Sequence, residues 1–192
     1  MKWWEAAAAA LVLVGSSAGA LAQKAGQANA DSFVKAVREQ DNANAMDMLR
    51  ENPGLIDARG DKGQTALIAA IGERDPEWTA FLLSRGADPN FTGEDGDRPL
   101  IAAARAGFED GAMLLLEKGA KVDATNKRGE TALIVAVQRK QPAIVKLLLG
   151  SGADPDKNDS FAGYSARDYA LQDTRSRDII KLIEAKKPPP RP

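Results

Sequence analysis

The chain has 192 residues, a formal net charge of −1 and 44% hydrophobic residues, a composition that suits one ordinary soluble domain or a short array. Because the charge is nearly balanced, there is no overall attraction to nucleic acid or to anionic membranes, and we expect no nucleic-acid partner. The chain has no Cys and no His, which excludes disulfides, thiolate or imidazole metal sites and catalysis that depends on either side chain.

The first segment, residues 1–22, differs from the rest of the chain. Lys2 precedes an uncharged run that ends in Ala-Leu-Ala at residues 20–22, followed by polar Gln23. This pattern predicts a secretory signal peptide cleaved before Gln23, so we expect an extracytoplasmic protein, periplasmic or secreted, with no stable membrane insertion after cleavage. The run is close to the length of a membrane span, so an uncleaved segment that tethers the chain remains an alternative.

A short polar leader, residues 23–30, precedes a sequence that repeats every 33 residues. The phrase GQTALIAAIG at 63–72 returns as GDRPLIAAAR at 96–105 and as GETALIVAVQ at 129–138. A register kept over three units indicates a structural repeat, and a divergent unit stands on either side of the three. The predicted units are about 31–57, 58–90, 91–123, 124–156 and 157–185.

Each unit predicts two short helices. Thr65, Thr131 and Ser165 stand where a first helix begins, and their hydroxyls can cap free backbone N–H groups. A Pro opens the second helix in two units, at Pro76 and Pro142. A Gly then supplies the left-handed residue that ends the second helix; these are Gly86, Gly119 and Gly152.

This pattern resembles the ankyrin repeat. The matching residues are Thr65-Ala66-Leu67, Pro99-Leu100 and Thr131-Ala132-Leu133, with Gly-Ala-Asp at 86–88 and 152–154. The resemblance implies an all-α solenoid of about five helix-turn-helix units with divergent end caps. It also implies a protein-binding scaffold whose concave face is formed by loop fingers and first helices.

The sequence departs from the family pattern at two kinds of position. The slot of the family's His is occupied by Ile68, Ile101 and Ile134, which we expect to stack between units as an apolar ladder. The Gly expected between the two helices is Gly107 in one unit, but Arg74 and Lys140 occupy this place in others. A left-handed backbone there costs about 1 kcal/mol.

The concave face is the predicted binding surface. We expect the loop finger of the third unit (91–123) to be acidic and that of the fourth unit (124–156) to be mostly basic. Such a surface would suit a partner with the opposite arrangement of charges. Exposed aromatic anchors would strengthen such a surface, and Phe91, Phe108, Phe161 and Tyr164 are the candidates. The predicted contact residues are Asp61, Lys62, Gln64, Glu73, Glu94, Asp95, Asp97, Arg105, Lys127, Arg128, Glu130, Gln138 and Arg139.

The sequence therefore predicts a monomeric, non-enzymatic scaffold that binds another protein and needs no cofactor. A small metal-dependent or catalytic protein is the other alternative. Glu94, Asp95 and Asp97 are hard-cation ligands in type, but FTGEDGDRP lacks the length and late Glu of an EF-hand loop. The Pro-rich tail KKPPPRP, residues 186–192, is expected to extend as polyproline II in solvent, with docking on a partner as the alternative.

Overall fold

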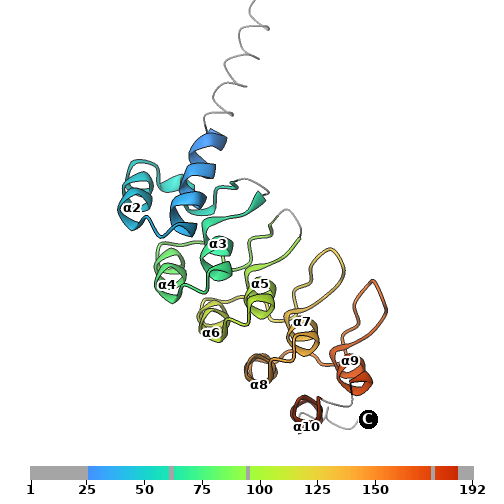
Figure 1. The fold of residues 1–192 in the computed structure, drawn as a ribbon. Coiled ribbons are helices and arrows are strands. Elements are labelled where there is room, and N and C mark those ends of the chain that lie inside the picture. Colours follow the sequence, from blue (N-terminus) through green and yellow to red (C-terminus); the bar gives the residue numbers. More distant parts are fainter. Residues whose placement is uncertain (1–25, 61–62, 94–95, 174–175, 186–192) are drawn as a thin grey trace, which may run out of the picture.

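The computed structural model describes residues 26–60, 63–93, 96–173 and 176–185. Within these ranges the chain forms helical hairpins that stack one after another into a curved solenoid (Figure 1). The all-α repeat architecture predicted from the sequence is confirmed. No helix in the described part is long and apolar enough to cross a membrane. The predicted signal peptide and the tail 186–192 lie outside the described residues.

The helices come in pairs that follow the 33-residue register. A helix through residues 26–38 comes first, so part of the predicted polar leader is helical, and Ala30 is buried there. The elements after it are α2 (Asn42–Glu51), η1 (Pro53–Asp57), α3 (Ala66–Gly72), α4 (Pro76–Ser84), α5 (Pro99–Ala106), α6 (Glu109–Glu117), α7 (Ala132–Gln138), α8 (Pro142–Gly150), α9 (Ala166–Gln172) and α10 (Arg177–Ala185).

The predicted hydroxyl caps are present. Thr65 Oγ1 accepts a hydrogen bond from the N–H of Ile68 at 3.3 Å, and Thr131 Oγ1 accepts one from Ile134 at 3.2 Å. Ser165 forms a reciprocal capping box with Asp168. Each hydroxyl satisfies a backbone donor that has no partner inside the helix, which fixes where the first helices of these units begin.

Arg98 stands at the same position in the third unit and makes no side-chain cap. Its guanidinium instead donates to the carbonyl of Asn90 at 2.8 Å and to that of Thr125 at 3.4 Å. Arg98 therefore links its own unit to the next one.

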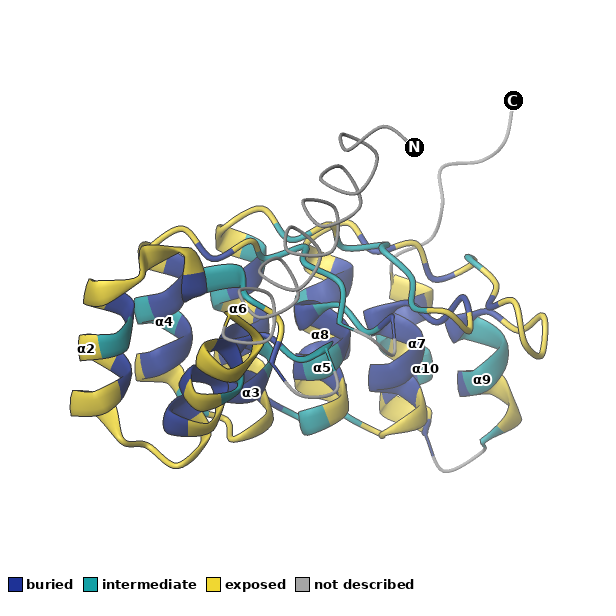
Figure 2. Ribbon diagram, turned by 90° about the horizontal axis from the view of Figure 1, so that it is seen from above, coloured by how far each residue is buried: buried dark blue, intermediate teal, exposed yellow. Residues whose placement is uncertain are grey.

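The first and second helices form two layers, and buried residues face the neighbouring helices (Figure 2). Of the expected Ile ladder, Ile101 and Ile134 are only 1% and 0% exposed. Ile68 is half-buried, and its Cδ1 lies 3.3 Å from where a β-carbon on Gly93 of the next finger would stand. The slot is therefore apolar and lies inside the stack, as a ladder between units requires.

The turns between paired helices contain left-handed residues, as expected for Arg74 and Lys140. Both have a φ of 56°, against 69° for Gly107, and Gln40 has 57° in the first unit. At all three positions without Gly, the side chain reaches into the following unit. Its interaction there offsets part of the backbone strain. The partners are Asp75 for Gln40, the carbonyl of Ala106 for Arg74 and Asp173 for Lys140.

The loop fingers pack directly against one another through glycines. Gly129 has a φ of 74°, and a β-carbon there would lie 2.4 Å from the backbone nitrogen of Ser160 in the next finger. Gly96 has a φ of 76°, and its β-carbon would lie 2.6 Å from Cγ of Lys127. Both positions need Gly for conformation and also for the close approach of the neighbouring finger.

We predict that Gly129→Ala lowers the free energy of unfolding by about 2–4 kcal/mol, because overpacking adds to left-handed strain. Gly152→Ala is the matched control, since Gly152 also has positive φ but nothing lies within 4 Å of its β-carbon position. The control should lose only about 1 kcal/mol. Urea unfolding followed by circular dichroism measures both, and equal losses would contradict the finger packing described here.

Candidate functional site: the finger and first-helix surface

The surface is built from repeated hairpin fingers. In the fourth finger, residues 124–131, the N–H of Asn126 donates to the carbonyl of Glu130 at 3.1 Å, and Gly129 donates back to Asn126 at 3.0 Å. The third finger, residues 91–98, repeats this geometry between Gly93 and Asp97. The fingers extend on the side of α3, α5, α7 and α9, whereas α4, α6, α8 and α10 form the opposite side (Figure 1).

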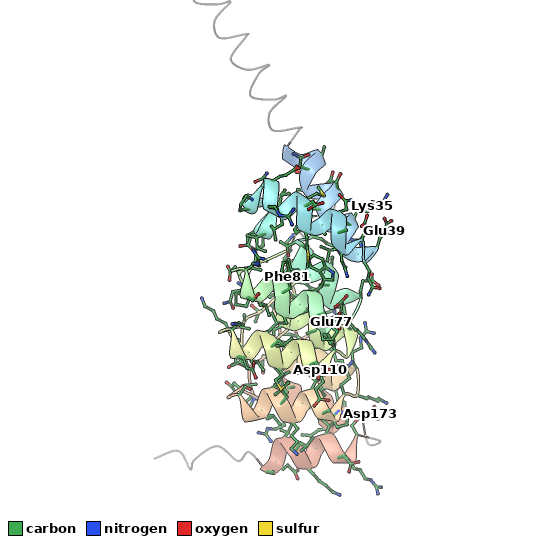
Figure 3. The ribbon with its side chains drawn as sticks, turned by 90° about the vertical axis from the view of Figure 1, so that its left-hand side faces the viewer. Lys35, Glu39, Glu77, Phe81, Asp110 and Asp173 are labelled. Atoms are coloured by element: carbon green, nitrogen blue, oxygen red, sulfur yellow. The ribbon has the colours of Figure 1, made fainter. Side chains whose placement is uncertain are left out.

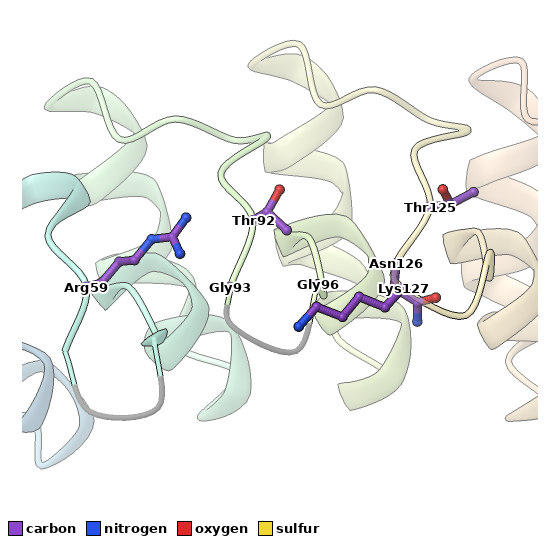
Figure 4. Close-up of a pocket in the computed structure, with 7 residues that line it drawn as sticks. All are labelled: Arg59, Thr92, Gly93, Gly96, Thr125, Asn126 and Lys127. Carbon is purple, nitrogen blue, oxygen red and sulfur yellow. The ribbon is translucent and has the colours of Figure 1, made fainter.

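A hollow of about 460 Å³ lies between the second, third and fourth fingers (Figure 4). Arg59, Thr92 and Thr125 line it at a spacing of 33 residues, so the same position of three successive repeats contributes to the lining. Gly93, Gly96, Asn126 and Lys127 complete the lining. Arg59 and Lys127 are the charged residues of this described lining.

A chain of polar contacts ties the third and fourth fingers to α5. Asp97 pairs with Arg105 at 2.8 Å and accepts a hydrogen bond from the amide of Asn126 at 3.2 Å. The same amide donates to Glu130 at 2.9 Å, and Arg128 pairs with Glu130 at 3.3 Å. Four predicted contact residues therefore bind one another through Asn126, which the sequence reasoning did not single out.

Glu130 is only 4% exposed, so its carboxylate is a structural acceptor and we leave it out of the binding surface. Gln64 is half-buried and accepts a hydrogen bond from Arg38 at 2.6 Å. Glu73, Gln138 and Arg139 are exposed at the ends of α3 and α7, and Lys127 is exposed in the fourth finger. Asp61, Lys62, Glu94 and Asp95 lie outside the described residues, and with them the predicted acidic tip of the third finger.

The four aromatic candidates differ in exposure. Phe108 is buried, and Phe91 is half-buried under the guanidinium of Arg59, 4.9 Å from the ring centre. Phe161 and Tyr164 in the fifth finger, residues 157–165, are 78% and 43% exposed. The guanidinium of Arg128 lies 5.1 Å from the centre of the Phe161 ring.

The fifth finger is held by one carboxylate. Asp159 Oδ1 accepts hydrogen bonds from the N–H groups of Phe161, Ala162 and Gly163 at 3.0, 2.7 and 3.0 Å. Its other oxygen accepts from the hydroxyl of Tyr169 at 2.6 Å. Asp159 therefore fixes the backbone that presents the exposed Phe161.

The pKa values of Asp159 and Tyr169 are shifted by the same contacts. Burial alone would raise the pKa of Asp159, but the Tyr169 hydroxyl and the three N–H groups outweigh it and hold the pKa below its usual value. The hydrogen bond to Asp159, followed by burial, raises the pKa of Tyr169 to about 12. Tyr169 is a residue that the sequence reasoning missed, because only the folded chain brings it to Asp159.

A family model described as "Ankyrin repeats (3 copies)" matches residues 74–159. Residues 74–159 are therefore similar to ankyrin repeats. The all-α repeat fold of the described residues is consistent with the ankyrin-repeat solenoid predicted from the sequence, and ankyrin repeats are generally protein–protein interaction scaffolds and typically not enzymes. A search of curated proteins finds no match to the chain.

The calcium alternative rests on Asp97 together with Glu94 and Asp95, which are not described. The Asp97 carboxylate is already paired with Arg105 and Asn126. In the described part of the chain, no group of three or more acidic residues could hold a metal ion.

We predict that Tyr169→Phe lowers the free energy of unfolding at pH 7 by about 1.5–3 kcal/mol, because a hydrogen bond to a charged group is lost. The folded-state pKa of Tyr169 is raised, so its contribution is complete below pH 10 and is lost as the pH rises toward 12. The variant should therefore lose less stability than the wild type over this range.

Urea unfolding between pH 7 and 12 measures both effects. Tyr164→Phe is the matched control, because it removes a hydroxyl from the same finger without touching Asp159. Equal losses in the two variants, or the same alkaline profile for Tyr169→Phe and wild type, would rule out the assigned role.

Proposed function

We propose that this chain is an exported scaffold that binds another extracytoplasmic protein through the surface of its fourth and fifth fingers. The observation that carries the proposal is Phe161, which is 78% exposed on a finger whose backbone is fixed by Asp159. Interface hot spots favour aromatic and Arg side chains, and here the two types lie in contact. A rigid exposed ring also loses little conformational freedom on binding.

The position of this ring within the repeat supports the proposal. The hairpin bonds align Asp159 with Asn126 and Tyr164 with Glu130, so the segment around Phe161 corresponds to the charged tip around Lys127 and Arg128. At this position of the repeat, the fifth finger thus carries an aromatic side chain where the fourth finger carries charged side chains. Glu130 and Asp97 are engaged within the solenoid, which leaves Phe161, Tyr164 and Arg128 as the contact residues we favour.

The proposed compartment rests on the sequence of residues 1–22 alone. A lone Lys, an uncharged run and an Ala-x-Ala pattern before Gln23 support export with cleavage. Sequencing the N-terminus of the protein recovered from its host tests this directly. A chain that begins at Gln23 supports an exported scaffold, whereas one that retains residues 1–22 supports the tethered alternative.

We predict that a photo-crosslinking amino acid placed at position 161 yields an adduct with a specific protein in cells. Met113 on α6 is the matched control position, because it is exposed and apolar but lies on the layer of second helices. The purified partner should then bind Phe161→Ala at least tenfold more weakly than wild type, as expected when a hot-spot ring is removed. Equal adducts from both positions, or unchanged affinity for Phe161→Ala, would count against the proposed surface.

A further inference from the structure

A second candidate surface lies on the side of the second helices, away from the fingers. A hollow of about 250 Å³, which we call the convex hollow, opens between α2 and α4. Its lining comprises Asn42, Met46, Glu77, Trp78 and Phe81. Figure 3 shows Glu77 and Phe81 on this face of α4. Met46 is 44% exposed at the hollow.

The aromatic wall of the convex hollow is held in place. The Trp78 and Phe81 rings meet edge to face, with centres 5.2 Å apart. The indole N–H of Trp78 donates to Asn42 Oδ1 at 2.5 Å, and Arg85 lies over the Phe81 ring with its guanidinium 5.0 Å from the centre. The wall is therefore preformed, and of its two rings Phe81 is half-buried whereas Trp78 is only 4% exposed.

The rim of the convex hollow is acidic. Glu77 is exposed, is the charged residue of this lining, and forms no ion pair with another residue in the described ranges. Arg74, three residues before Glu77 in the sequence, directs its guanidinium to the carbonyl of Ala106 instead. The hollow thus combines aromatic and thioether walls with the negative charge of Glu77, which suits an apolar segment that carries cations.

We propose that the convex hollow binds the segment KKPPPRP, residues 186–192, of a second copy of this chain. Pro-rich segments dock in aromatic-lined grooves as preformed polyproline II helices, and the side chains of Trp78, Phe81 and Met46 supply such a groove. The segment has three cationic side chains and no acidic side chain, so its charge is complementary to Glu77.

The reach of the segment favours a second copy. Seven residues of polyproline II span about 22 Å from Ala185, at about 3.1 Å per residue. Two further helices, α6 and α8, lie between α4 and α10 (Figure 1). Packed helices are about 8–10 Å apart, so three such steps give about 24–30 Å. The proposed contact joins two different surfaces of two copies. The chain would then self-associate, in contrast to the monomer expected from the sequence. The contact does not involve the finger surface.

The test measures binding of a fluorescein-labelled KKPPPRP peptide to the full chain by fluorescence anisotropy. We expect saturable binding that Glu77→Lys weakens about tenfold or more. Asp110→Lys is the matched control, because Asp110 occupies the same helix position 33 residues later but does not line the hollow. We expect it to change affinity less than twofold. An EEPPPEP peptide should bind at least tenfold more weakly than KKPPPRP.

Sedimentation velocity then tests the second copy. The full chain should self-associate as its concentration rises past the peptide dissociation constant, and the variant Lys186→Glu/Lys187→Glu/Arg191→Glu should remain monomeric. Three results would overturn the proposal: no binding of KKPPPRP at millimolar concentration, equal weakening by Glu77→Lys and Asp110→Lys, or a chain that stays monomeric at ten times the peptide dissociation constant. Circular dichroism confirms that each variant is folded.

Discussion

The structure depends on one constraint: the apolar faces of each unit can be covered only by the units beside it. First helices of seven or eight residues are too short to be stable alone, and their conformation comes from packing. Leu67, Leu100 and Leu133 recur at the same position, and all three are buried. A stack of this kind distributes stability over the contacts between adjacent units.

Repeated polar residues serve the same stacking. The Oδ1 atoms of Asp57, Asn90 and Asp123 each accept a hydrogen bond from a backbone N–H 31 residues further along, at 3.0, 2.8 and 3.0 Å. Arg98 and the left-handed Arg74 also reach carbonyls of the following unit. Repeated residues, together with some that depart from the repeat, therefore hold adjacent units together.

The sequence predicted the fold well because the period fixes residue types at many offsets at once. It predicted the site less well, because exposure depends on contacts between fingers that are far apart in sequence. Asp97 and Glu130 read as exposed charges, yet Asn126 and two Arg side chains bind them. Likewise Phe108 and Phe161 were equivalent candidates, but Phe108 fills the space beside Gly111 whereas Phe161 faces solvent.

The central claim is that adjacent units are coupled through the buried slot that follows each repeated Leu. A double-mutant cycle on Ile101→Ala and Ile134→Ala, measured by urea unfolding, tests this claim most directly. The account predicts that the two losses of unfolding free energy are non-additive by at least about 0.5 kcal/mol, as for residues in contact across a shared interface. Losses that add to within about 0.3 kcal/mol would show that the two side chains act independently, and would contradict an apolar ladder between units.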